Sequence, residues 1–218
     1  AYRDQGQIQL ALRDFEQSTR LGDGGEGLFA TAEWLVASGR RGQALQALAG
    51  ALSRGMDGAP VLINAGALLE AQGEPELALR AYTRAIEAPG AAREFVAEAR
   101  AKRALLSFAL GRVSADIFTD VEQALAVAPG GFSSRLADAY ARLARKDVPA
   151  ARERFERLHG ERPTLATASG LLQTLKAAGD LDAARRLLAE HGGLTDDKDR
   201  RALNELALRL GLTEGPRS

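Results

Sequence analysis

The segment 25–92 repeats its own residue pattern after 34 positions, and this period constrains the fold more than any other feature. With Gly25 and Ala59 each placed at position 1, similar residues coincide at positions 4, 11, 15, 20, 24 and 27. The matching pairs are Leu28 and Leu62, Leu35 and Leu69, Gly39 and Gly73, Ala44 and Ala78, Leu48 and Tyr82, and Ala51 and Ala85. An internal period of this length is typical of helix–turn–helix units that stack side by side.

The spacing of the apolar residues predicts two helices in each of these units. The first pair is expected at about 27–37 and 41–53, and the second at about 60–71 and 75–87. Gly39 and Gly73 separate the helices of a pair, because glycine tolerates the left-handed backbone that ends a helix.

The rest of the chain continues the pattern with one interruption. A half repeat is expected at 1–24, full repeats at 25–58, 59–92, 93–131, 132–164 and 165–195, and a capping helix or the start of a further repeat at 196–211. The pattern slips by five residues in the repeat 93–131, so its first helix is predicted to be long, at about 91–110. The half repeat and the absence of an initiator Met predict a piece of a longer protein, and a natural start with a single capping helix is the alternative.

These positions resemble the tetratricopeptide repeat (TPR) family, with Pro129 and Pro163 at the family's proline near the end of a repeat. The resemblance covers nearly the whole chain, although Leu and Ala replace most of the large aromatic residues that the family carries at positions 4 and 11. It implies an all-α fold, a right-handed α-solenoid of stacked helix pairs that forms a single array.

The composition of the chain disfavours several classes of partner and binding site. Lys and Arg together number 29, as do Asp and Glu, and a neutral chain is not typical of a nucleic-acid-binding protein. Cysteine is absent, so neither disulfides nor a thiolate metal site are expected. No apolar run approaches the roughly 20 residues of a membrane-spanning helix, so no span is predicted within this sequence.

The sequence predicts no enzyme activity and no cofactor or metal. The glycine-rich stretch 22–27 has helical flanks, and it therefore indicates a turn between repeats more than a phosphate-binding loop. His159 and His191 both lie near the ends of second helices, where the helix dipole favours a histidine. A metal-binding or catalytic pair is the alternative interpretation of these two residues.

The resemblance also indicates where a partner binds, because the first helices of TPR pairs line a concave groove. The residues at the groove positions are Glu26, Phe29, Glu33, Val36, Ile63, Asn64, Ala67, Glu70, Lys102, Arg103, Leu106, Ala137, Asp138, Arg145, Ser169, Gln173 and Lys176. The first two repeats are acidic there and the later ones carry positive charge, so a ligand polarised in the opposite sense is one interpretation. The other interpretation is that these charged residues form an ordinary solvated surface.

Two specialised TPR-like functions are disfavoured. Of the five residues that hold a C-terminal carboxylate in chaperone-binding TPR domains, Asn64 and Arg103 match, whereas Phe29, Glu33 and Ala99 depart, and Glu33 would repel the carboxylate. The RNA-binding pentatricopeptide relatives carry a basic groove, because phosphate neutralisation dominates their affinity. Neutral overall charge and apolar groove residues argue against that function.

The sequence therefore predicts a non-catalytic scaffold that presents a rigid surface to a protein partner, with 89–103 as a further place to look for contact. Its Ala, Leu and Arg content without cysteine resembles the periplasmic TPR regions of bacterial outer-membrane exopolysaccharide exporters of the cellulose and Pel type. That resemblance implies a periplasmic location and a polysaccharide-modifying enzyme as the partner. A cytoplasmic scaffold or the sensor domain of a regulator is the alternative, and direct carbohydrate binding is a third that the 5% aromatic content disfavours.

Overall fold

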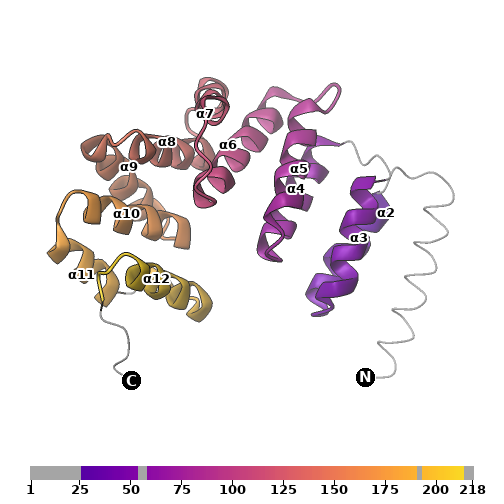
Figure 1. The fold of residues 1–218 in the computed structure, drawn as a ribbon. Helices are drawn as coiled ribbons and strands as arrows, with labels where there is room; N and C mark the ends of the chain where they lie inside the picture. Colours follow the sequence, from indigo (N-terminus) through magenta and orange to yellow (C-terminus); the bar gives the residue numbers. More distant parts are fainter. Residues whose placement is uncertain (1–25, 54–57, 191–192, 214–218) are drawn as a thin grey trace. The chain divides into compact units, whose positions relative to one another are not determined.

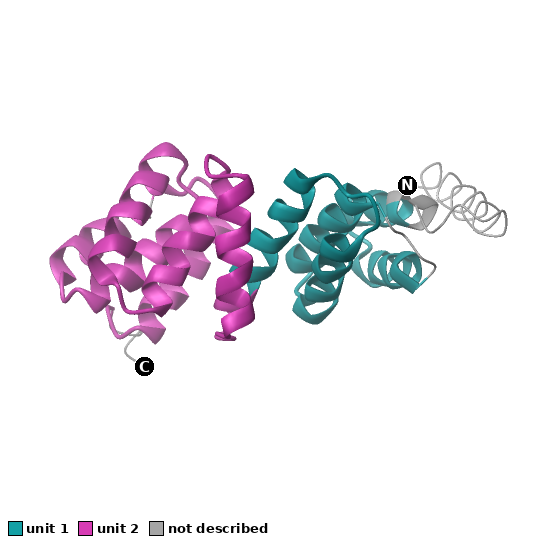
Figure 2. Cartoon of the chain, turned by 90° about the horizontal axis from the view of Figure 1, so that it is seen from above, with its two compact units in different colours: residues 1–106 teal, residues 107–218 magenta. Residues whose placement is uncertain are grey.

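The computed structural model describes residues 26–53, 58–190 and 193–213, and its helices α2 to α12 in these ranges are α-helices (Figure 1). The half repeat predicted at 1–24 and His191 lie outside the described residues. The chain divides into two compact units, residues 1–106 and 107–218, which Figure 2 colours separately. The boundary falls near the end of one helix, so a single element contributes to both units.

In the described part of unit 1, helix pairs lie at the positions that the 34-residue period predicts. Its described helices are α2 (Glu26–Ala37), α3 (Arg41–Ser53), α4 (Ala59–Ala71), α5 (Pro75–Glu87) and most of α6 (Arg93–Ala109). Helix α2 packs against α3, and α4 packs against α5. Helix α6 has 17 residues and is the longest described helix, as the slip in the repeat pattern predicted.

The described helices of unit 2 follow the end of α6. They are α7 (Ala115–Val127), α8 (Phe132–Ala144), α9 (Val148–Glu161), α10 (Leu165–Ala177), α11 (Leu181–Ala189) and α12 (Asp197–Arg209). Helix α8 packs against both α7 and α9, and α10 packs against α9, α11 and α12. Within the described ranges, no helix combines the length and the apolar content that a membrane crossing requires.

Each pair is closed by the same backbone turn. The left-handed residues of these turns, with φ between 62° and 75°, are Gly39, Gly73, Gly111, Lys146 and Gly179. At each turn the left-handed residue donates its N–H to the carbonyl three residues back, and the next residue donates to the carbonyl five residues back. This Schellman arrangement satisfies carbonyl groups that the helix end leaves unpaired. Lys146 is the one turn residue of the five that is not glycine.

In each unit a fully buried aromatic side chain lies at the middle of a second helix, within a core of mostly Ala and Leu. In unit 1, Tyr82 of α5 is fully buried against Gly66 of α4. In unit 2, Phe155 of α9 is fully buried against Gly170 of α10 and meets the ring edge of Tyr140 at a centroid distance of 4.9 Å. Glycine is required at both contact points because any side chain there would overlap the aromatic ring.

Candidate protein-binding surfaces

The predicted groove residues of the first helix pairs divide into buried and exposed sets. Phe29 and Ile63 are only 8% and 6% exposed and belong to the hydrophobic core of unit 1, so little of either side chain is available to a partner. Glu33 and Asn64 are exposed on α2 and α4. Glu26 begins α2, and its side chain lies outside the described part of the structure.

Glu70 and Lys102 lie close together around a buried tyrosine. The Tyr82 hydroxyl of α5 donates a 2.6 Å hydrogen bond to Glu70 Oε1 at the end of α4. Burial is the main cause of a raised pKa at Glu70, which the Tyr82 hydrogen bond and the positive charge of Lys102 partly oppose. Lys102 Nζ also lies 3.6 Å from Glu98 Oε1 on α6. The Tyr82 hydrogen bond thus joins the exposed Glu70 of α4 to α5.

Arg103 also bonds to α5, because its Nη1 donates a 3.1 Å hydrogen bond to Thr83 Oγ1. Lys102 and Arg103 are half-buried, so each presents part of its side chain to solvent. Glu70 of α4 and Arg103 of α6 thus both bond to α5, through the neighbouring residues Tyr82 and Thr83, and Lys102 precedes Arg103 on α6. Glu70 and Arg103 lie 33 positions apart in the sequence, and only their positions within the repeats indicate that they belong to the same surface.

In unit 2, Asp138 and Arg145 lie seven residues apart on α8 and its C-cap, and therefore on the same side of the helix. Arg145 Nη2 donates to Glu122 Oε1 of α7 at 3.0 Å, and its guanidinium lies 4.2 Å from the centre of the Phe118 ring. Gln173 is half-buried and Lys176 is exposed, both on α10. No contact connects these α10 residues to the Asp138 side of α8 among the interactions described.

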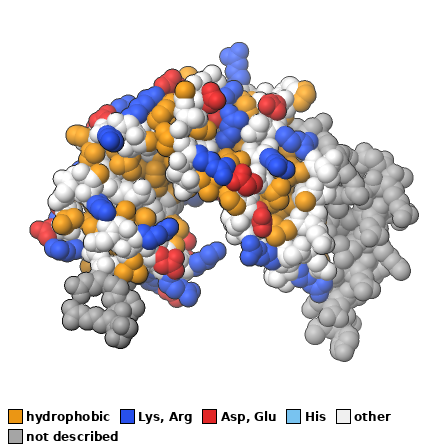
Figure 3. Space-filling view, in the orientation of Figure 1, with side chains coloured by type: hydrophobic (Ala, Val, Ile, Leu, Met, Phe, Trp, Pro, Cys, Tyr) orange, Lys and Arg blue, Asp and Glu red, His pale blue; other side chains and the backbone are white. Residues whose placement is uncertain are grey.

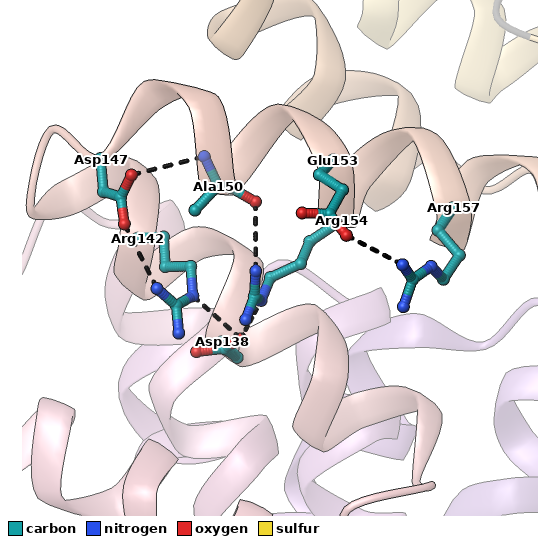
Figure 4. Close-up of polar contacts among 7 residues, drawn as sticks. All are labelled: Asp138, Arg142, Asp147, Ala150, Glu153, Arg154 and Arg157. Carbon is teal, nitrogen blue, oxygen red and sulfur yellow. Dashed lines mark hydrogen bonds and ion pairs between the residues drawn. The ribbon is translucent and has the colours of Figure 1, made fainter.

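Asp138 is bonded to two arginines and is mostly buried. Its Oδ2 accepts from Arg142 Nε at 3.3 Å and from Arg154 Nε of α9 (Figure 4). Arg142 also donates to Asp147 at 3.2 Å, and Arg154 to the Ala150 carbonyl at 3.4 Å. The Asp138 side chain is 17% exposed. Its role in the structure is to join α8 to α9, which a groove position alone did not indicate.

A small cavity of about 240 Å³ opens beside this network in unit 2. Its lining residues come from the end of α7, from α8 and from α9: Leu125, Pro129, Arg135, Asp138, Glu153, Arg154, Arg157 and Leu158. We call this cavity the arginine pocket. Sequence reasoning found only Asp138 among these residues. In an Arg-rich chain, arginines on second helices have the same spacing as an ordinary solvated face, so no local signal marks the pocket.

Arg135 has an unusual environment at the arginine pocket. Its Nη1 and Nη2 donate to Glu161 Oε1 and Oε2 at 2.9 and 2.7 Å, and this pairing raises the pKa of Arg135 and lowers the pKa of Glu161. Its Nε is buried and has no hydrogen-bond partner within the described structure. A buried donor without an acceptor is uncommon, since its desolvation is not repaid.

Outside the arginine pocket, charged side chains and potential metal ligands are dispersed over the described residues. On the face seen in Figure 3, Lys and Arg side chains are interspersed with Asp and Glu side chains. Among the described residues, no group of three or more His, Asp or Glu side chains is placed to hold a metal ion. His159 Nδ1 lies 3.0 Å from Thr167 Oγ1, and burial lowers the pKa of His159. This contact joins α9 to the start of α10.

Comparison with models of protein families gives no match, and neither does comparison with curated proteins. Among solved structures, a tetratricopeptide repeat protein from Parabacteroides merdae is similar to this chain with a TM-score of 0.66 and 20% identity, over 97% of this chain and 83% of that one. The fold is TPR-like. The all-α fold class predicted from the repeat is therefore confirmed.

Two further structures share this TPR-like fold. BtubC from P. vanneervenii has a TM-score of 0.56 and 19% identity, over 98% of this chain and 95% of that one. PilF from Pseudomonas aeruginosa has a TM-score of 0.52 and 16% identity, over 87% of this chain and 90% of that one. At these identities the likeness concerns the fold alone.

Proposed function

We propose that this chain is a non-catalytic scaffold that holds a segment of a partner protein against the first helices of its repeats. The proposal rests on charged residues at the predicted groove positions of unit 1, of which Glu70 and Arg103 are hydrogen-bonded to Tyr82 and Thr83 of α5. A TPR-like fold displays such residues on helices, where the side chains have little backbone freedom left to lose on binding.

Charges held in this way favour recognition of a complementary segment. Glu70 is fixed by Tyr82, and Arg103 is fixed by Thr83, so a partner need not order these side chains when it binds. Complementary charges contribute chiefly to the rate of encounter and to the orientation of the bound segment. The exposed Glu33 and Asn64 supply further polar contacts on the neighbouring first helices.

Co-purification from native cell extract tests this function. The double variant Glu33→Arg with Arg103→Glu reverses two predicted contact charges and leaves the net charge unchanged. The matched control is Asp182→Arg with Arg185→Asp, which exchanges an exposed ion pair on α11. We expect partner capture to be lost in the first variant and retained in the control. Equal capture by both variants and the unaltered chain would show that these residues do not bind the partner.

Within this function, we assign a narrower role as the periplasmic TPR region of an exopolysaccharide export protein, with a polysaccharide-modifying enzyme as the partner. The support is compositional: Ala, Leu and Arg are abundant and cysteine is absent. Cell fractionation and identification of the captured protein test it. Capture of an enzyme that acts on polysaccharides, in the periplasmic fraction, is the expected result. A cytoplasmic complex would favour the alternative scaffold or sensor role instead.

A further inference from the structure

We propose that the arginine pocket of unit 2 binds the side chain of an acidic residue, Glu or Asp, in a segment of the partner protein. This inference rests on the proposed scaffold function and adds a second contact point, on the α7, α8 and α9 side of unit 2. No predicted groove residue other than Asp138 lines it. The occupant follows from the size, the apolar lining and the charges of the pocket.

The size of the pocket suits one side chain. Its volume of about 240 Å³ lies below the 300–1,000 Å³ typical of sites for drug-sized ligands. Leu125, Pro129 and Leu158 line part of it and offer apolar contact to the methylene groups of an acidic side chain. A whole cofactor is too large for this space, whereas one anchoring residue of a peptide fills it.

Three arginines line the pocket. Arg154 and Arg157 are three residues apart on α9 and so share one face of that helix. Arg135 approaches from the first turn of α8. Guanidinium groups keep their charge at all ordinary pH values and match the two oxygens of a carboxylate with parallel N–H donors. The chemistry of the pocket therefore favours a carboxylate.

Arg157 can exchange its present partner for a ligand at little cost. It pairs with Glu153 across one turn of α9 at 2.9 Å, and the two side chains are 65% and 64% exposed. Exposed ion pairs of this kind contribute little to stability, because water solvates both charges well. An incoming carboxylate can thus take the place of Glu153, which returns to water.

Arg135 offers a donor that the folded chain leaves unused. Glu161 occupies both of its Nη groups, whereas its buried Nε has no acceptor among the described residues. Binding of a carboxylate to Nε requires the Arg135 side chain to turn toward the pocket, because Nε is buried in the unbound chain. Supplying an acceptor to a buried donor removes its desolvation penalty, which adds to the affinity of the ligand.

The remaining carboxylates do not favour a basic ligand. Asp138 already accepts from Arg142 and Arg154 through Oδ2 (Figure 4), so the two arginines offset its negative charge. A Lys or Arg side chain entering the pocket would meet three guanidinium groups and find only Glu153 exposed. Like-charge repulsion therefore selects against it.

Side-chain NMR of the full chain tests the pocket with defined probes. The first probe is acetyl-Leu-Glu-Leu-amide, the second is the same tripeptide with Gln, and the third is inorganic phosphate. The readouts are the Arg Nε–H resonances and the backbone amides of α8 and α9. We expect the glutamate peptide to bind about tenfold more tightly than the glutamine peptide, as for a charge-assisted contact, and to shift the Arg135 Nε–H resonance.

Three variants refine the test. Arg157→Gln is expected to weaken binding of the glutamate peptide about tenfold, whereas Arg185→Gln, which removes a similarly exposed arginine of α11, should leave it unchanged. Glu153→Gln removes the competing carboxylate and is expected to tighten binding a few-fold. All three side chains are exposed, so none of these substitutions should affect folding.

The outcomes are distinct from those of the capture experiment. Equal binding of the two peptides, no shift at Arg135, or no effect of Glu153→Gln overturns the pocket proposal. Phosphate shifting the same resonances at lower concentration than the glutamate peptide also overturns it and indicates a phosphate site. The peptides are used without the natural partner. A negative result in peptide binding therefore contradicts the pocket proposal and does not affect the co-purification experiment. Equal capture by the groove variant, its control and the unaltered chain would contradict the scaffold proposal alone.

Discussion

The ring of Tyr82 lies so close to Gly66 that a methyl group on Gly66 would come within 2.4 Å of Tyr82 Cε1. Tyr82 cannot retreat, because it is fully buried and its hydroxyl is bonded to Glu70. We expect Gly66→Ala to lower the free energy of unfolding by about 1–3 kcal/mol, as overpacking does. Urea denaturation measures the effect.

The matched control for this substitution is Gly42→Ala in α3, where an added methyl group would meet no atom within 4 Å. It removes the helix penalty of glycine and should raise stability by up to about 1 kcal/mol. If the two alanine variants were equally stable, the close approach of Tyr82 to Gly66 would not constrain the core.

Lys146 takes the left-handed turn position that glycine holds in the other four closed pairs, with φ of 62°. A residue with a side chain costs about 1–2 kcal/mol in the left-handed conformation. Replacing it with glycine removes this strain, but part of the gain is lost because glycine loses more conformational freedom on folding. We expect Lys146→Gly to raise stability by about 0.5–1 kcal/mol. Lys146→Ala removes the same side chain but keeps the strain, so it should bring no such gain in thermal unfolding.

The stability of unit 2 should depend on pH through His159. Burial lowers its pKa in the folded chain below the usual value of 6.5, so the unfolded chain binds the proton more readily. Stability attributable to this residue is therefore present above pH 6.5 and is lost as the pH falls from there towards the folded pKa. Thermal unfolding from about pH 7.5 to about pH 5.5 should show a smaller decline in His159→Gln than in the unaltered chain. Parallel declines would contradict this expectation.

Asp138 should be important for stability even without a partner. Asp138→Ala leaves Arg142 and Arg154 without their shared acceptor, and we expect a loss of about 1–2 kcal/mol. Glu122→Ala breaks the more exposed pair with Arg145 and should cost less than about 0.5 kcal/mol. Equal effects in chemical denaturation would mean that Asp138 does not join α8 to α9.

The elements of the fold were predictable because their signals are local. The 34-residue period, together with Gly39 and Gly73, indicates where the helices begin and end. The expected bounds of α2 to α5 agree with the structure to within one residue. The slip in the third repeat predicted the long α6. These signals depend on neighbouring residues along the chain, so no tertiary contact was needed to recognise them.

The candidate sites were less predictable because they depend on contacts between helices. Register placed Phe29 and Ile63 at groove positions but does not say how deeply the neighbouring helix covers them. It also does not reveal that Asp138 accepts from an arginine of the next helix. The unpartnered Nε of Arg135 follows from side-chain geometry that no spacing encodes.

The backbone turn that closes the helix pairs has a consequence for how such a chain can grow. Its two hydrogen bonds join main-chain atoms only, and the residue before the left-handed position differs at Ser38, Gln72, Arg145 and Ala178. Each pair therefore carries its own reversal of chain direction, whatever the flanking side chains are. A gene duplication that adds a pair can preserve this reversal without compensating mutations in the turns beside it.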